Sequence, residues 1–312
     1  MVSSPSLATL SPTQLDTWLA LARQQARAGK LPDYIPALAQ ANPEALAIAI
    51  QTRQGNPYLG GDRTQVFPLM SVIKPFLLLY VLTTQGAEAV FSYVGMDPSD
   101  RPFNSLAQLQ ADRGFPRNPM LNSGALTLAA HLPGDTPQER CLNLSQWLNQ
   151  QAGSQLHLDA GILASVRSRP NSRNQELAEC LAAAGSLVQS AASALDTYEH
   201  ICCLAGTIAD LSQLGMVLVS PPPNLTPDHC RIVTAIMGTC GLYEDSGRFA
   251  VTAGLPCKSG VSGALLAIVP GQGAIACYSP PLDAKGNSVA GLWLVTQLAT
   301  SLHLSVFYRD SA

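Results

Sequence analysis

Residues 71–84 read SVIKPFLLLYVLTT, in which Lys74 is the one charged side chain. A helix that is apolar almost all round is buried on every side by the rest of the protein. We therefore predict a central buried helix, on which Ser71 and Lys74 lie three positions apart and share one face. Burial lowers the pKa of a lysine because it penalises the charged form, and a neutral amine can take the proton of a neighbouring serine hydroxyl. The stretch thus predicts a buried helix and a candidate nucleophile.

A second lysine motif, Lys258-Ser259-Gly260, lies in an apparent strand near the other end of the chain. Taken alone, each motif has a plain structural explanation: a lysine that reaches solvent from a helix end, and a glycine-rich edge strand. Taken together and in this order, they form the pair found in serine β-lactamases and penicillin-binding proteins. The pair favours an enzyme that transfers an acyl group.

Strand-like patterns lie toward the two ends of the chain, and helical periodicity fills the middle. The strand-like runs are 45–51, 57–60, 247–252, 257–269 and 273–279. Helical patterns in the middle cover 120–131, 137–151, 158–165, 172–184, 191–203 and 207–219, and further helices are expected from Pro12, near 226–239 and over 287–305. We predict an α+β fold: a mostly antiparallel sheet, built from both chain ends and flanked by helices, with an inserted all-helical domain.

The predicted division into domains follows from the same pattern. A chain of 312 residues has room for about two domains. Residues 1–95 together with 225–312 are predicted to form the sheet domain, and residues 96–224 the helical domain. We expect the active site between the two.

The composition excludes several classes of protein. Charged residues make up 12% of the chain and the net charge is −3, whereas a nucleic-acid-binding surface is basic. The hydrophobic fraction of 47% excludes disorder. No apolar run approaches the ~18 residues of a membrane span and no signal peptide is recognised, so we expect a cytoplasmic protein without nucleic-acid or membrane partners.

The low content of charged residues indicates either a polar, uncharged surface or a surface that is partly buried in an oligomer. We expect a homodimer or homotetramer.

The cysteines indicate a reduced protein without a metal centre. Eight cysteines contain no Cys-x-x-Cys pair and show no zinc-ligand spacing with the five histidines. Reduced, buried thiols are therefore expected, as in a cytosolic protein.

Longer motifs make the resemblance to one family specific. They are 33–39 (DYIPALA), 71–75 (SVIKP), 118–125 (NPMLNSGA), 173–174 (RN), 195–198 (LDTY), 240–243 (CGLY), 254–261 (GLPCKSGV) and 279–283 (SPPLD). In this order they resemble the serine-dependent glutaminases, which share the β-lactamase/transpeptidase-like fold. The resemblance runs from about residue 30 to about residue 305, nearly the whole chain.

The resemblance implies hydrolysis of L-glutamine to L-glutamate and ammonia through a Ser-Lys acyl-enzyme mechanism, with no metal and no organic cofactor. It implies that Ser71 is the nucleophile, that Lys74 activates it, and that Tyr243 relays protons to the departing ammonia. The backbone N–H groups of Ser71 and Val261 are expected to form the oxyanion hole. The substrate-binding residues that we expect are Tyr34, Asn122, Asn174, Tyr198, Tyr243, Lys258 and Val261.

Two positions depart from the family pattern. Met70 stands where the family has Gln, and Arg167 stands where it has a substrate-binding Glu, seven positions before Asn174. The departures leave open a related amidohydrolase that acts on a different amino-acid amide, or a catalytically weak regulator that binds an amino acid. The intact serine, lysine and tyrosine positions argue against the regulator. We expect Arg167 to turn toward solvent and another acceptor to hold the substrate ammonium.

Overall fold

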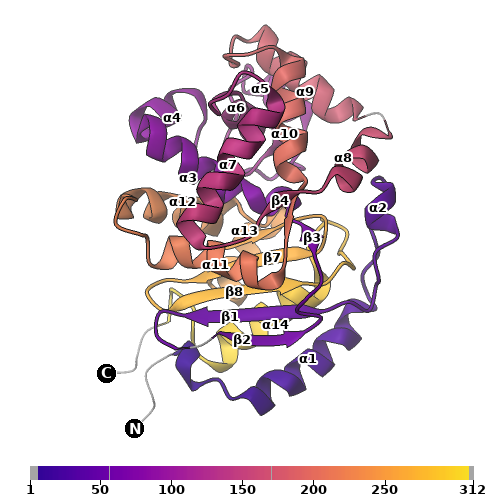
Figure 1. Ribbon diagram of the computed structural model, residues 1–312, viewed down its shortest axis with the longest axis vertical. Helices are drawn as coiled ribbons and strands as arrows, with labels where there is room; N and C mark the ends of the chain where they lie inside the picture. Colours follow the sequence, from indigo (N-terminus) through magenta and orange to yellow (C-terminus); the bar gives the residue numbers. More distant parts are fainter. Residues whose placement is uncertain (1–5, 56, 170, 309–312) are drawn as a thin grey trace.

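A five-stranded antiparallel sheet crosses the middle of the molecule (Figure 1). The computed structural model describes residues 6–55, 57–169 and 171–308. The strand order is β2-β1-β8-β7-β6, with β1 (Ala47–Thr52), β2 (Tyr58–Gly61), β6 (Cys257–Ser259), β7 (Ala264–Val269) and β8 (Gly273–Tyr278). Ala47 of β1 pairs with Tyr278 of β8, so the two chain ends meet in one sheet. The predicted α+β fold and the origin of its sheet are confirmed.

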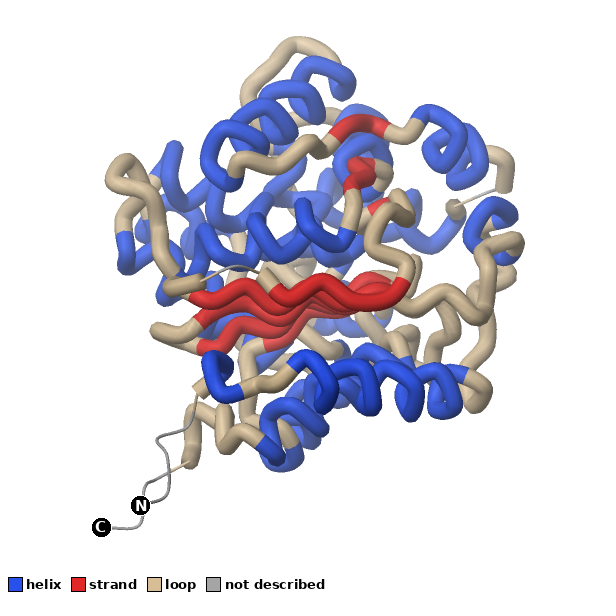
Figure 2. Tube along the Cα trace, turned by 60° about the horizontal axis from the view of Figure 1, so that its bottom comes forward, coloured by secondary structure: helices blue, strands red, loops and turns tan. Residues whose placement is uncertain are grey.

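Helices cover both faces of this sheet (Figure 2). Side chains alternate along a strand, so each strand contributes to two cores. Ile48 and Ile50 face a core shared with α1 (Pro12–Ala26) and α14 (Val289–Ser301). Alanines on β1 and β8 face the other core, which is shared with α11 (Ile208–Val219) and the central buried helix. These alanines are Ala47, Ala49, Ala274 and Ala276.

Small residues bring α11 close to the sheet. A Cβ atom added to Gly215 of α11 would lie 2.6 Å from the Cβ atom of Ala274. Any larger side chain at either position would push the helix away, because interiors are close-packed. This contact ties the helical part of the chain to the sheet.

The apolar stretch 71–84 forms the centre of the helical part. It begins with the 3₁₀ turn η2 (Met70–Ile73) and continues as α3 (Lys74–Gln85), in which every residue from Lys74 to Leu82 is buried. The predicted buried helix is confirmed. The helices on this side of the sheet are α2 (Pro36–Ala39), α4 (Ala87–Tyr93), α5 (Leu106–Ala111), α6 (Asn122–Ala130), α7 (Pro137–Ala152), α8 (Ala160–Arg167), α9 (Ser172–Ala183), α10 (Ala191–Cys202), α11 and α12 (Pro227–Cys240).

Two of the expected strands were wrong. Residues 247–252 form the helix α13 (Ser246–Thr252), which buries Phe249 and packs against α12, so tertiary packing overrides the β-like pattern. The run 257–269 is two strands, β6 and β7, because a turn at 260–263 reverses the chain. Gly263 closes that turn at φ +95°, a backbone conformation that favours glycine.

The expected all-helical middle of the chain also contains two short strands. β4 (His157–Leu158) and β5 (Leu204–Gly206) join β3 (Phe67–Pro68) in a second sheet of order β3-β5-β4. The helix expected over 158–165 therefore starts two residues later, as α8. Strands of two or three residues show no periodicity, so pattern analysis missed them. The domain boundaries at 95/96 and 224/225 stay a prediction. Among the described residues, no helix combines the length and the apolar character needed to cross a membrane.

Candidate active site

Ser71 lies in η2, directly ahead of α3, and is almost completely buried. The residue before it, Met70, has φ +48°, a left-handed conformation that is uncommon for a side chain other than glycine. Such strain persists only where the surrounding structure enforces it, and it clusters at functional sites. Gly260, the residue after β6, packs closely against this segment, because a Cβ atom there would lie 2.6 Å from the carbonyl oxygen of Leu69. The Lys-Ser-Gly strand is thus packed against the backbone that presents Ser71.

Lys74 is fully buried at the first position of α3. Its Nζ donates hydrogen bonds to the carbonyl oxygen of Met120 at 3.0 Å and to Oδ1 of Asn122 at 2.7 Å. Burial lowers the pKa of Lys74 to about 8, so the neutral amine is accessible near physiological pH. A neutral amine has two N–H bonds and one lone pair, so these two acceptors use both of its donors.

Lys258 is a second fully buried lysine, in the middle of β6. Its Nζ donates to the carbonyl oxygen of Ser259 at 2.6 Å and lies 4.4 Å from the centre of the Tyr243 ring. Burial, and then the charge of Lys74, hold the pKa of Lys258 well below its usual value. Two buried lysines in one site each disfavour the charge on the other.

Tyr243 begins the 3₁₀ turn η3 (Tyr243–Asp245) with φ +57°, the second left-handed residue at the site. Its hydroxyl donates to the carbonyl oxygen of Ser259 at 3.4 Å, and Phe103 packs on its ring at 4.7 Å between centroids. Burial raises the pKa of Tyr243 to about 12, while hydrogen bonding to Ser259 and Ser71 opposes that rise. The phenol therefore keeps its proton and suits the role of an acid.

Amide side chains and a second phenol surround the lysine. Asn122, at the start of α6, accepts from Lys74 and from the hydroxyl of Tyr198 at 3.1 Å through its Oδ1 atom. Its Nδ2 donates to Oδ1 of Asn174 on α9 at 2.8 Å. Hydrogen bonding to Ser71 opposes the burial that raises the pKa of Tyr198. One hydrogen-bond network therefore links Lys74, Ser71 and the polar groups that were predicted to hold substrate.

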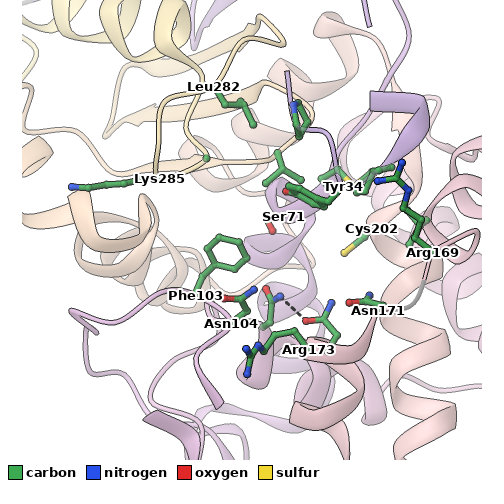
Figure 3. A pocket seen from close by; sticks show the side chains of 18 of the residues that line it. Tyr34, Ser71, Phe103, Asn104, Arg169, Asn171, Arg173, Cys202, Leu282 and Lys285 are labelled. Atoms are coloured by element: carbon green, nitrogen blue, oxygen red, sulfur yellow. Dashed lines mark hydrogen bonds between the residues drawn. The ribbon is translucent and has the colours of Figure 1, made fainter. Parts of the chain in front are cut away.

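A cavity of about 730 Å³ opens above Ser71 (Figure 3). The predicted residues that line it are Tyr34, Ser71, Asn122, Asn174, Tyr198 and Val261. Tyr34 comes from the segment before α2 and is 51% exposed. Lys74 and Lys258 are fully buried in the surrounding protein. The structure thus brings together every site residue that the sequence predicted, from segments almost 230 residues apart.

Several cavity residues were missed by sequence reasoning. Phe103 and Cys202 contribute an aromatic ring and a buried thiol, and Figure 3 shows both beside Ser71. Arg169 also lines the cavity and donates to the carbonyl oxygen of Asp33 at 2.9 Å, which holds the Tyr34 segment in place. These roles depend on which helices meet, and no local pattern in the sequence signals them.

Arg167, the departure from the family pattern, is held by carboxylates. It ends α8, its side chain is 38% exposed, and it forms ion pairs with Asp196 and, at 3.4 Å, with Glu199. Both acids lie on α10, about 30 residues further along the chain, so the sequence around Arg167 does not reveal them. We expected a solvated guanidinium, and the structure shows a half-exposed, paired one. Glu199, and not Arg167, is among the residues that line the cavity.

Comparisons with known proteins agree on one family. The sequence model of the family described as Glutaminase matches residues 29–307. A glutaminase of Synechocystis sp. is 48% identical over 292 residues, which cover 93% of this chain and 89% of that protein. Glutaminase 2 of Escherichia coli K12 is 37% identical over 288 residues, covering 89% of this chain and 92% of its own length.

Solved structures show the same relationship. The probable glutaminase ybaS superposes with a TM-score of 0.88 at 35% identity and covers 96% of this chain and 100% of its own. A probable glutaminase from Bacillus subtilis, solved in complex with 6-diazo-5-oxo-L-norleucine, superposes with a TM-score of 0.86 at 28% identity, covering 95% of this chain and 96% of its own.

Proposed function

From the premise that the chain belongs to the glutaminase family and hydrolyses L-glutamine, we propose that Ser71 is the covalent nucleophile of the reaction. One observation carries the proposal: Ser71 lines the cavity and lies three residues before a fully buried lysine whose pKa is lowered to about 8. A serine hydroxyl needs such a neighbouring base to attack an amide.

In the first half of the reaction, Lys74 takes the proton of Ser71 while Oγ forms a bond to the side-chain carbonyl carbon of glutamine. The negative charge develops on the amide oxygen, where the backbone N–H groups of Ser71 and Val261 stabilise it. Preorganised donors of this kind contribute about 3 kcal/mol each to catalysis. The packing of Gly260 against Leu69 supports this role, because it fixes the two backbone segments relative to each other.

Collapse of the intermediate breaks the carbon–nitrogen bond and requires a proton on the leaving group. Tyr243 supplies it, since its raised pKa keeps the phenol protonated. Lys74 then passes the proton that it took from Ser71 to Tyr243, which restores the phenol. The amine of Lys258 lies against the ring of Tyr243 during this transfer. Water then attacks the carbonyl carbon of the acyl group while Lys74 takes a proton from it. The bond to Ser71 breaks, and Lys74 returns that proton to the Ser71 oxygen. The products are L-glutamate and ammonia.

The amino-acid end of glutamine lies between Tyr34, Asn122, Asn174 and Tyr198 in this proposal. Their position on the cavity wall and the hydrogen bonds among the last three support it. Lys258 was predicted as a binding residue, and its contact with the Tyr243 ring suggests that it acts on substrate through that phenol.

The decisive experiment is Ser71→Ala. Loss of a covalent nucleophile costs on the order of 10⁶ in kcat. Ammonia release from L-glutamine is expected to vanish while the thermal melt stays that of the wild type. A folded Ser71→Ala protein with more than a few per cent of the wild-type rate would remove Ser71 from the mechanism. Asparagine and γ-glutamyl amides in the same assay define the substrate range.

We further propose that the enzyme works in the cytoplasm as a homodimer or homotetramer. All eight cysteines are free, as expected in a reducing compartment. Exposed apolar side chains, among them Val188, Val251 and Phe307, support burial in an oligomer. Light scattering during gel filtration tests the oligomeric state, and a monomer at micromolar concentration would contradict it.

A further inference from the structure

L-glutamine carries an α-ammonium group that needs a partner once the substrate enters a cavity. Taking a charge out of water without an opposite charge or acceptors is costly. We propose that Glu199 binds this ammonium, an inference that rests on the proposed glutamine site. Arg167 leaves the need open, because a guanidinium at that position repels an ammonium instead of binding it.

The charges around the cavity single out Glu199. Two carboxylates, Glu199 and Asp283, belong to the described residues that line it. Asp283 uses Oδ1 to accept the backbone N–H groups of Lys285 and Asn287, both at 2.9 Å, so it holds its own loop together. Glu199 has no such local role, since its described partners come from the segment 167–171.

Four positively charged residues belong to the described wall, and three of their side chains are engaged elsewhere. Arg169 donates to the carbonyl oxygen of Asp33. Lys285 pairs with Asp245 and extends away from the cavity (Figure 3). Arg173 forms an ion pair with Glu176 at 3.0 Å on its own helix. These pairings leave room for a positively charged ligand group on the α10 side.

The register of α10 places Glu199 beside the substrate-binding groups. Tyr198, Glu199 and Cys202 occupy positions i, i+1 and i+4, which adjoin on one side of a helix, and all three line the cavity. Tyr198 reaches both Asn122 and Ser71. The next residue on the helix is therefore positioned for the amino-acid end of the same substrate.

Hydrogen bonds hold the carboxylate of Glu199 in place, and it can still accept further hydrogen bonds. Its side chain is 12% exposed, Oε1 accepts from Nδ2 of Asn171 at 3.3 Å, and Oε2 accepts from Nε of Arg167 at 3.4 Å. An ionised carboxylate accepts about four hydrogen bonds, so these two leave room for an ammonium. Asn171 is itself a cavity residue.

Arg167 neutralises Glu199 only in part. Its guanidinium is shared between Asp196, which does not line the cavity, and Glu199, which does. The contact with Glu199 is the longer of the two, at 3.4 Å. The Glu199 carboxylate therefore keeps negative charge that an α-ammonium can neutralise.

The experiment compares Glu199→Gln with Asp196→Asn. Both variants remove a carboxylate that pairs with Arg167 on the same helix, but Asp196 is not among the cavity residues. We expect Glu199→Gln to raise KM for L-glutamine about 10- to 100-fold, the range for a hydrogen bond to a charged group, with kcat within about threefold. Asp196→Asn should leave both constants within about threefold.

Product inhibition isolates the ammonium. L-glutamate carries the α-ammonium and glutarate lacks it, so Glu199→Gln should weaken inhibition by L-glutamate at least about tenfold and leave inhibition by glutarate unchanged. Equal weakening of both inhibitors, or an unchanged KM, overturns the inference. Glu199→Asp is the second variant in case Glu199→Gln does not fold. It should weaken L-glutamate binding more than glutarate binding, and equal effects on the two also overturn the inference. Activity in Ser71→Ala would refute the proposed nucleophile and leave this comparison intact.

Discussion

The two ends of the cavity are built on different physical principles. Around Ser71 the groups are buried and the charged forms are suppressed, as the lowered pKa values of both lysines and the raised pKa of Tyr243 show. Around Arg167 and Glu199, by contrast, oppositely charged side chains pair with each other, and the Arg167 side chain is 38% exposed. In the proposed mechanism, desolvation sets the protonation of the reacting groups, whereas in the proposed binding site an opposite charge selects a zwitterionic substrate. Substitutions at the first should therefore act mainly on kcat, and those at the second on KM.

The largest effect after loss of the nucleophile is expected at Lys74. In Lys74→Arg the guanidinium stays charged and cannot take a proton from Ser71. We expect kcat/KM to fall by about 10³-fold or more, within the range of general-base catalysis. Ammonia release, with a thermal melt as the control for folding, measures it. An active arginine variant would show that another group is the base and that desolvation of Lys74 serves packing alone.

Gly260→Ala should misalign the reacting end without touching a titratable group. Its new Cβ atom would meet backbone, the carbonyl oxygen of Leu69, so the strand or the segment before Ser71 must shift. A displacement of about 1 Å can cost about 10²-fold in rate. Gly247→Ala is the matched control, since no atom lies within 4 Å of the added Cβ atom there. Wild-type kcat in Gly260→Ala would mean that the close contact is unimportant.

The pH dependence tests the protonation state that desolvation sets. The pKa of Lys74 is lowered to about 8, and only the neutral amine is a base. Below pH 8 the active fraction should fall about tenfold per pH unit, and above pH 8 it should level off. The pH profile of kcat/KM for L-glutamine measures this limb. A profile that is flat from pH 6 to 8 would exclude Lys74 as the titrating base.

The smallest effect is expected at the binding end, in Arg167→Gln. The guanidinium is half-exposed, and ion pairs of that kind contribute only about 0–1 kcal/mol to stability. Without the guanidinium, the negative charge of Glu199 is no longer partly neutralised, and the carboxylate attracts the substrate ammonium more strongly. KM for L-glutamine should therefore fall by up to about threefold while kcat stays constant. A rise in KM would show instead that Arg167 is needed to orient the Glu199 carboxylate.

The same contrast explains what the sequence could predict. The reacting end was predictable because its signals are local: an apolar run that buries Lys74, and a Lys-Ser-Gly motif whose first two residues lie on β6. The sheet was predictable because strand-like runs lie at both ends of the chain. The left-handed backbone conformation of Met70 and Tyr243 could not be predicted, because tertiary contacts enforce it and the residue type does not.

The binding end was predictable only in part. Position 167 was recognised as unusual, but its partners on α10 are about 30 residues away and become neighbours only after the helices pack. The helix α13 was mistaken for a strand for a similar reason: the packing that decides it is against α12. Contacts between two particular helices produce no periodic pattern in a single sequence, so such contacts cannot be predicted from it.

The pairing of β1 with β8 determines at which stage of protein synthesis the sheet and the site beside it can form. Ala47 and Tyr278 are more than 200 residues apart, and Val261 belongs to the late segment as well. A nascent chain that has already brought Ser71 and Lys74 out of the ribosome therefore lacks the centre of its sheet and also lacks Val261, the proposed second oxyanion donor. Such non-local pairing slows folding, and a chain awaiting its partner strand exposes an unpaired edge. The proposed active site can therefore form only after residue 278 has left the ribosome, and the partly made chain is most prone to aggregation before that point.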